Sequence, residues 1–246
     1  MDPIKTQFNK SEFDFAYPVG IEHHYWTISR NFLLARALEK AGLRDEVMLE
    51  VGCGKGLVVA ALRTRMMTCW GAELADVTPI PEVSEYVTSN VDATALDDRF
   101  RNQVKVLMFL DVLEHIEDPI KFLENILTYF PGASHLVITV PARNEIWSNY
   151  DLFYRHFRRY DLDRVNQMIL PLHFKTDFIS YAFHMLYWAA RLKFLISKDR
   201  PIKNNAPIGF LKFIHQAIAW MLVMESRLLP KTWPGTSIIC VASKIK

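Results

Sequence analysis

Three glycines at alternate positions, Gly52, Gly54 and Gly56, directly follow an apolar run that is typical of a buried strand. A glycine has no side chain, so the backbone can turn tightly and approach a bound ligand at these positions. A dinucleotide-binding loop has its third glycine one position later, and residue 57 here is Leu57. The spacing therefore predicts a ligand-binding loop and argues against a dinucleotide.

Carboxylates follow the next two predicted strands. Glu73 ends the second strand, where a carboxylate can accept hydrogen bonds from both hydroxyls of a ribose. Asp92 and Ala93 follow a weaker third strand, and they can offer a carboxylate to an adenine amino group and a backbone N–H to a ring nitrogen. With the glycine loop, these residues predict a site for an adenine nucleoside.

The elements that must position these residues alternate between strand and helix. Capping residues mark the ends of the expected helices. Gly42 can cap the C-terminus of a helix over 26–41, Asp118 followed by Pro119 can begin a second helix, and Asp161 can begin a third. Seven segments have strand character, at 46–51, 67–73, 86–91, 104–110, 136–140, 174–181 and 237–242. This alternation predicts an α/β fold with a parallel, doubly wound sheet.

The glycine loop, Glu73, Asp92 with Ala93 and the segment 111–119, in this order and at this spacing, resemble class I S-adenosylmethionine-dependent methyltransferases. The segments 22–30 and 141–160 extend the resemblance to a broad bacterial group of the ubiquinone-biosynthesis-like type, over most of the chain. The resemblance implies a Rossmann-like, mostly parallel seven-stranded sheet with an antiparallel last strand and helical additions. It also implies an enzyme of the general class EC 2.1.1.-.

The resemblance further implies S-adenosylmethionine as cofactor and S-adenosylhomocysteine as product. The residues that it assigns to the cofactor are Glu50, Gly52, Gly54 and Gly56 for the methionine end, Glu73 for the ribose, Asp92 and Ala93 for the adenine, and Asp111 after the fourth strand. The acceptor does not follow from the resemblance, because related folds serve unrelated substrates.

Proton removal from a hydroxyl or ammonium acceptor would need a base. His115 follows the fourth strand beside the expected methyl donor, and we predict it as the base ahead of Asp151 and His156. A histidine at this position can equally shape the pocket or cap the next helix. Both interpretations of His115 therefore stand at this point.

Aromatic and basic residues mark two segments as substrate-binding candidates. Tyr25 and Trp26 precede the first helix and can fold over the cofactor as a lid, although aromatic clusters often serve only packing. The second group consists of Arg155, Arg158, Arg159 and Tyr160. These residues can bind a phosphate or carboxylate of the substrate; the alternative interpretation is that they form a solvated surface.

Histidine and cysteine spacing indicates no metal site. The neighbours His23 and His24 have no carboxylate or cysteine at a recognised ligand spacing. The three cysteines are widely separated in apolar surroundings, which predicts neither disulfides nor a zinc cluster. We therefore expect no metal and a reducing, cytoplasmic location.

Length favours one domain over residues 1–246, with additions on the substrate side at 1–45 (a helical lid), 142–170 (an insertion after strand five) and 182–233 (a helical region). No apolar run reaches the length of a membrane-spanning helix. The segment 217–224 is apolar around a whole helical turn, which predicts burial, with peripheral membrane contact as the alternative hypothesis.

Charge narrows the choice of acceptor. A formal net charge of +2 is too small for a dedicated nucleic-acid binder. We expect methyl transfer to oxygen or nitrogen, rather than carbon, of a small apolar or anionic molecule. The alternatives are a nucleic-acid methyltransferase and a protein that binds S-adenosylmethionine without catalysis, and a dehydrogenase is a more distant one.

Overall fold

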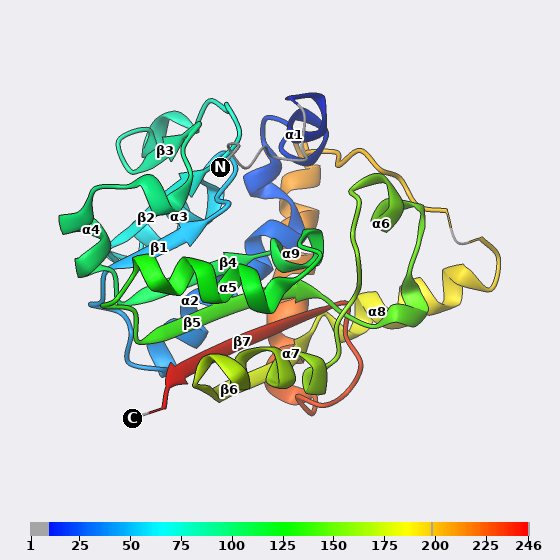
Figure 1. Ribbon diagram of the computed structural model, residues 1–246. Helices are drawn as coiled ribbons and strands as arrows, with labels where there is room; N and C mark the ends of the chain where they lie inside the picture. Colours follow the sequence, from blue (N-terminus) through cyan, green and yellow to red (C-terminus); the bar gives the residue numbers. More distant parts are fainter. Residues whose placement is uncertain (1–9, 198, 246) are drawn as a thin grey trace.

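A computed structural model describes residues 10–197 and 199–245, which fold around a seven-stranded sheet (Figure 1). The strand order is β3-β2-β1-β4-β5-β7-β6; β1 to β5 pair in parallel, and β7 is antiparallel to β5 and β6. The strands are β1 (Met48–Val51), β2 (Cys69–Glu73), β3 (Val87–Ser89), β4 (Val106–Leu110), β5 (His135–Pro141), β6 (Phe174–Ala182) and β7 (Ser237–Lys244). This topology confirms the predicted fold class.

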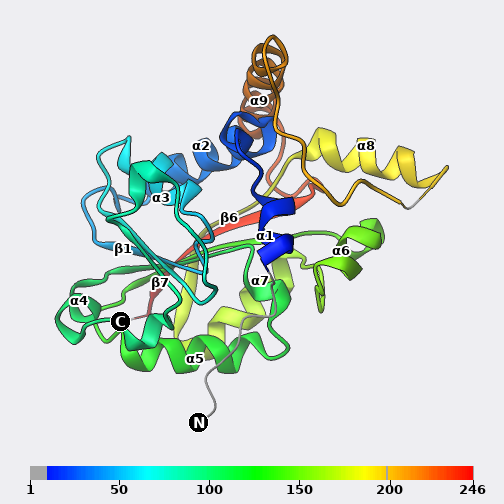
Figure 2. The same ribbon diagram turned by 90° about the horizontal axis from the view of Figure 1, so that it is seen from above.

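Helices cover both faces of the sheet (Figure 2). On one face lie α2 (Tyr25–Lys40), α3 (Leu57–Arg63) and α9 (Leu211–Leu228). On the other face lie α4 (Asp98–Gln103), α5 (Pro119–Tyr129) and α7 (Leu162–Ile169). The remaining helices are α1 (Lys10–Ala16), α6 (Asn149–Phe153) and α8 (His184–Phe194).

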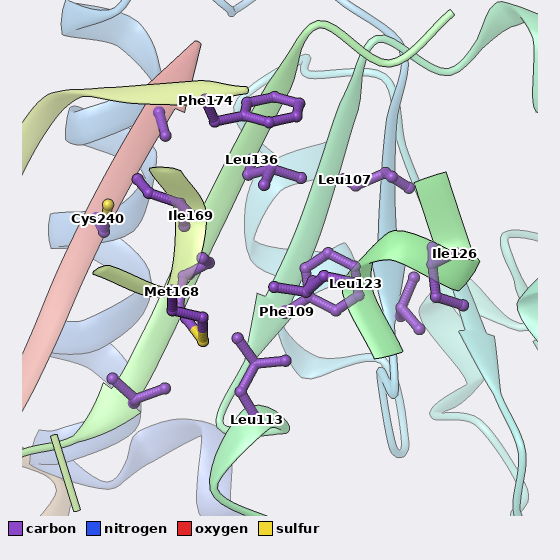
Figure 3. Packing of buried hydrophobic residues seen from close by; sticks show 14 of the residues in the cluster. Leu107, Phe109, Leu113, Leu123, Ile126, Leu136, Met168, Ile169, Phe174 and Cys240 are labelled. Atoms are coloured by element: carbon purple, nitrogen blue, oxygen red, sulfur yellow. The ribbon is translucent and has the colours of Figure 1, made fainter. Parts of the chain in front are cut away.

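The core is divided by the sheet into two apolar layers. In β4, Leu107 and Phe109 point to the layer under α5 and α7, whereas Val106 and Met108 point to the layer under α2 and α9. Figure 3 shows the first layer, where Leu123 of α5 packs beside Phe109. A strand that is buried on both faces explains why its sequence is continuously apolar.

Local capping works as the sequence predicts. The Asp118 carboxylate accepts a hydrogen bond of 3.1 Å from the N–H of Lys121, with Pro119 at the start of α5. The Asp161 carboxylate likewise accepts one of 2.7 Å from the N–H of Arg164 at the start of α7. These caps fix where α5 and α7 begin, and thus the loops that precede them.

The expected burial of 217–224 is wrong in part. One side of α9 packs Leu222 and Val223 into the core. Trp220, Met221 and Met224 on its other side are 48%, 44% and 49% exposed. The helix is apolar on all sides but packs against the core on one side only, so the apolar side chains on its other side are exposed to solvent.

Candidate active site

The glycine loop connects β1 to α3 with its backbone in the left-handed region. Gly52 and Gly56 have φ angles of +79° and +83°, which only glycine adopts without strain. A Cβ atom on Gly52 would lie 2.8 Å from Cγ2 of Val112, in the loop that follows β4. The missing side chain therefore allows the loops after β1 and β4 to meet.

Glu73 binds the glycine loop through its carboxylate. Its Oε2 accepts a hydrogen bond of 2.8 Å from the N–H of Gly54, and its Oε1 accepts one of 2.9 Å from the N–H of Ala75. Both atoms are buried, and burial raises the pKa of Glu73 while the backbone donors lower it. The carboxylate predicted to bind the ribose thus lies against the glycine loop.

Glu50 and Asp111 lie near each other at the ends of β1 and β4. The Nη1 of Arg30 in α2 donates a hydrogen bond of 2.6 Å to Oδ2 of Asp111. Burial raises the pKa of Glu50 to about 8; Arg30 opposes this shift, and the charges of Glu73 and Asp111 add to it. Within the described residues, Oε2 of Glu50 is buried without a hydrogen-bond partner, as expected of an atom that awaits a donor from a ligand.

Asp92 and Ala93 follow β3, which is the neighbour of β2 in the sheet. One carboxylate oxygen of Asp92 accepts hydrogen bonds of 2.8 Å from both the N–H and the hydroxyl of Thr94. Ala93 is buried. These bonds fix the orientation of Asp92 at the carboxyl edge of the sheet, and its contact with adenine stays a prediction.

Tyr17, after α1, is a site residue that the sequence analysis missed. A Cβ atom on Gly54 would lie 3.0 Å from Cζ of the Tyr17 ring, so the phenol covers the glycine loop. Burial raises the pKa of Tyr17 well above its usual value, and Arg30 opposes the shift. Lys55 ties the same segment down, since its Nζ donates to the carbonyl of Tyr17 and to Asp14. A single tyrosine before a proline gave no signal in the sequence.

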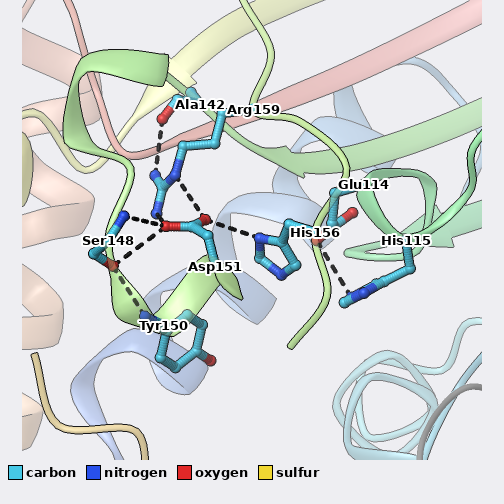
Figure 4. A network of polar contacts seen from close by, with 8 residues as sticks. All are labelled: Glu114, His115, Ala142, Ser148, Tyr150, Asp151, His156 and Arg159. Atoms are coloured by element: carbon cyan, nitrogen blue, oxygen red, sulfur yellow. Dashed lines mark hydrogen bonds and ion pairs between the residues drawn. The ribbon is translucent and has the colours of Figure 1, made fainter. Parts of the chain in front are cut away.

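A second polar cluster is built around Asp151 of α6 (Figure 4). Its carboxylate is fully buried and accepts hydrogen bonds from Nε and Nη2 of Arg159, at 2.8 and 3.0 Å. It also contacts Nδ1 of His156 at 2.8 Å and accepts a bond from the N–H of Ser148 at 2.9 Å. Although burial opposes ionisation, these partners hold the pKa of Asp151 well below its usual range.

Glu114 and His115 face this cluster from the loop after β4 (Figure 4). Nε2 of His115 lies 4.0 Å from Oε1 of Glu114, and the rings of His115 and His156 meet edge to face with centroids 4.7 Å apart. Burial, followed by the neighbouring His156, lowers the pKa of His115 to about 3. His115 is therefore neutral at physiological pH. The structure brings all three predicted base candidates, His115, Asp151 and His156, into one cluster, and their roles stay predictions.

The predicted substrate-binding arginines contact groups of the protein itself. Arg155 forms an ion pair with Glu12 of α1, with Nη2 at 2.7 Å from Oε1. Arg158 donates from Nη2 to the carbonyl of Glu117 at 2.5 Å, and Arg159 is bound to Asp151. These contacts link the loop after α6 to α1 and to the segment before α5. A contact of the three arginines with substrate stays a prediction.

The aromatic candidates Tyr25 and Trp26 are the first residues of α2, not residues that precede it, and Tyr160 follows α6. The hydroxyl of Tyr160 is buried and donates to the carbonyl of Leu113 at 3.0 Å. Trp26 packs beside Phe183, and the guanidinium of Arg30 lies 4.6 Å from the Trp26 ring centroid. Tyr25 lies on the α9 side, with its ring centroid 5.3 Å from that of His215.

Comparison with known proteins identifies the class of this site. A sequence profile of the family described as a methyltransferase domain matches residues 23–188, about two thirds of the chain. The chain belongs to this family. S-adenosylmethionine is its cofactor, and plantazolicin methyltransferases of similar fold are crystallised with the product S-adenosylhomocysteine.

Individual relatives of this methyltransferase domain are distant. Ubiquinone biosynthesis O-methyltransferase of Pseudomonas fluorescens is 30% identical over 88 residues, which are 33% of this chain and 38% of that enzyme's length. A SAM-dependent methyltransferase of Thermotoga maritima has a TM-score of 0.53 at 14% identity, covering 94% of this chain and 98% of its own. The plantazolicin methyltransferase BamL has a TM-score of 0.53 at 12% identity, covering 96% and 89%. The two structures share the fold.

The residues of the methyltransferase domain fit the cofactor in chemistry and position. The unpartnered Oε2 of Glu50 can accept a hydrogen bond from the ammonium of the methionine end. Glu73 retains lone pairs on both oxygens for a ribose. Among the helices in the described part of the chain, none has the length and hydropathy to cross a membrane.

Proposed function

We propose that this methyltransferase transfers the methyl group of S-adenosylmethionine to an oxygen or nitrogen atom of a small molecule. The observation that carries the proposal is the cluster of Glu114, His115 and His156, which lies next to the loop that contacts the glycine turn through Val112. Neutral imidazole nitrogens and carboxylate oxygens are the groups that orient a hydroxyl or amine and accept its proton. An acceptor bound there would lie beside the methyl donor.

When bound, S-adenosylmethionine supplies an electrophilic methyl group, and transfer to an O–H or N–H acceptor leaves uncharged S-adenosylhomocysteine and one proton. The chain's residues must align the acceptor atom with the methyl carbon and exclude water. They must also receive the proton, a role predicted for His115, Asp151 or His156. Because the Asp151 carboxylate already accepts bonds from Arg159, we assign it the task of orienting His156.

A cover over this side of the protein supports an apolar acceptor. The chain between α8 and α9 lies across α1 and α6: the N–H of Asn204 donates to the carbonyl of Phe15, and Asn149 exchanges two hydrogen bonds with the backbone of Arg200. Exposed apolar side chains lie along the cover and the adjoining helices, namely Trp188, Leu192, Leu195, Ile196, Ile208, Phe210, Phe213 and Trp220. Such a surface suits an apolar substrate or the membrane surface that carries one.

An anionic acceptor is the second candidate, favoured by a separate observation. A depression on the surface is lined by Arg143, Arg158, Arg159 and Arg164, which outnumber its two carboxylates, Glu145 and Asp161; Arg143 is paired with Glu145 and Arg159 with Asp151. Guanidinium groups gathered in this way bind carboxylates or phosphates. Nucleic acid is less favoured, since a net charge of +2 provides little long-range attraction for a polyanion.

Methyl-labelled S-adenosylmethionine tests the proposal. The protein is incubated with separate pools of apolar phenols and alcohols, anionic hydroxy acids, amines, RNA and DNA, and the label is followed into each fraction. Label in a small-molecule fraction is the expected result, and the pool that takes it distinguishes apolar from anionic acceptors. Label in nucleic acid, or tight binding of S-adenosylhomocysteine with no methylated product in any pool, contradicts the proposal.

A further inference from the structure

Three side chains with metal-binding atoms converge beside the expected methyl donor (Figure 4). One ligand atom from each of Glu114, His115 and His156 lies within 4.8 Å of the other two. Ligand atoms about 2.1 Å from a shared cation lie roughly 3 to 4 Å apart. Small side-chain rotations would therefore bring the three groups into one coordination sphere.

His156 has the support that a metal-binding histidine needs. Its Nδ1 lies 2.8 Å from Oδ1 of Asp151, which leaves Nε2 as the nitrogen that is free of this contact. Asp151 is itself fixed by Arg159 and Ser148. A carboxylate that binds the remote nitrogen of a histidine sets its tautomer and ring orientation, which is the usual second layer of a metal site.

Glu114 provides an independent observation. Its side chain is 2% exposed, and Oε2 has no hydrogen-bond partner within residues 10–197 and 199–245. A buried carboxylate oxygen without a partner is costly, because it loses water without compensation. A cation bound between Glu114 and the two imidazoles would supply the missing interaction.

We propose that Glu114, His115 and His156 bind one divalent transition-metal cation that receives an oxygen atom of the methyl acceptor. Two imidazoles and one carboxylate suit Mn²⁺, Fe²⁺ or Zn²⁺, whereas Ca²⁺ and Mg²⁺ prefer oxygen ligands only. Three protein ligands leave coordination positions open for a substrate. This differs from the sequence-based expectation of no metal, which considered His23 and His24 and had no means of pairing His115 with a residue 41 positions away.

The cation changes the chemistry expected of His115. An imidazole nitrogen that binds a metal cannot take a proton, so both His115 and His156 would act as ligands instead of the base. A hydroxyl bound to the cation would have a lower pKa and would release its proton to solvent water. The acceptor part of this inference rests on the proposed function, and it narrows the acceptor to molecules with a hydroxyl or similar oxygen donor.

Direct metal binding tests the inference without any turnover. The full chain is treated with a chelator, desalted and titrated with MnCl₂, and free Mn²⁺ is followed by its electron paramagnetic resonance signal. We expect one Mn²⁺ per chain and at least tenfold weaker binding in Glu114→Gln and in His156→Gln. The matched control is His23→Gln, which alters an exposed histidine 3.5 Å from Glu22 and should leave the affinity unchanged.

Absence of stoichiometric Mn²⁺ and Zn²⁺ binding would overturn the inference, as would unchanged affinity in either variant that is folded. Thermal unfolding of each variant shows whether it is folded, and the result from either folded variant decides. S-adenosylhomocysteine is titrated into the same chelated samples. If the protein binds S-adenosylhomocysteine but no metal, only the proposed cation site is rejected. If the wild-type protein does not bind S-adenosylhomocysteine, the proposed methyltransferase function is rejected as well.

Discussion

The two halves of the active site are built differently. On the cofactor side, Glu73 holds the backbone of Gly54, and the contact joins residues 19 positions apart. On the acceptor side, side chains bind mainly other side chains: His156 and Arg159 share the Asp151 carboxylate from 5 and 8 positions away, and Arg155 pairs with Glu12, 143 positions away. The difference follows from the ligands: a backbone cradle suits one invariant cofactor, whereas a side-chain network can vary with the acceptor while the sheet stays the same.

Substitution of Asp151 should have the largest effect on stability, because the acceptor-side network depends on this buried charge. Asp151→Ala leaves the buried guanidinium of Arg159 without its carboxylate, which costs about 3 to 5 kcal/mol of unfolding free energy. Urea unfolding measures the loss. The exposed Asp163→Ala in α7 is the control and should stay within about 0.5 kcal/mol of the wild type. Equal stability of the two variants would contradict a structural role for Asp151.

Substitution of Gly52 should disturb the cofactor side by steric overlap rather than by loss of charge. Gly52→Ala places a Cβ atom 2.8 Å from Val112, whereas Gly42→Ala at a similar φ of +72° meets no atom within 4 Å. Both substitutions force an alanine into a left-handed backbone conformation. The difference between their losses of unfolding free energy therefore measures the steric overlap at Gly52, about 1 to 3 kcal/mol. We expect Gly52→Ala to unfold at lower urea and to bind S-adenosylhomocysteine more weakly. Similar values for both variants would argue against close contact between the two loops.

Glu50 should produce a smaller, pH-dependent effect. With a pKa of about 8, its carboxyl is mostly protonated at pH 7, and an ammonium group bound beside it would favour the ionised form. Binding of S-adenosylhomocysteine at pH 7 should therefore release approaching one proton, and the release should fall as the pH rises towards 8, where the free carboxyl is already half ionised. Calorimetry in two buffers of different ionisation enthalpy measures this release. Proton uptake, or release that persists in Glu50→Gln, would exclude Glu50 as its source.

The cofactor side could be predicted because its signals are local. The strand, the glycines and Glu73 lie within 26 residues (48–73), and each is expected from backbone geometry or from one charge at a strand end. The central parallel strands β1, β4 and β5 were equally readable, since buried parallel strands are continuously apolar. Tyr17 was not predictable, because its position over Gly54 depends on the path of the segment before α2.

The acceptor side was predicted only as a set of candidates. His115, Asp151 and His156 were recognised individually, but the sequence could not indicate that the Asp151 carboxylate is shared between His156 and Arg159. The metal-binding role proposed for Glu114 was missed, since His156 is 42 positions away in the sequence. The exposure of Trp220 was missed because apolar composition does not reveal which sides of a helix have neighbours.

The most direct test of the account is calorimetric titration of S-adenosylhomocysteine into the wild type, Glu73→Ala and Glu82→Ala, an exposed glutamate that serves as the control. The account predicts micromolar binding by the wild type and the control, and affinity weaker by about tenfold to a hundredfold in Glu73→Ala, through lost charged hydrogen bonds. Unfolding curves verify that the variants are folded. Wild-type protein that fails to bind S-adenosylhomocysteine, or Glu73→Ala that binds it equally well, would contradict the assigned cofactor site.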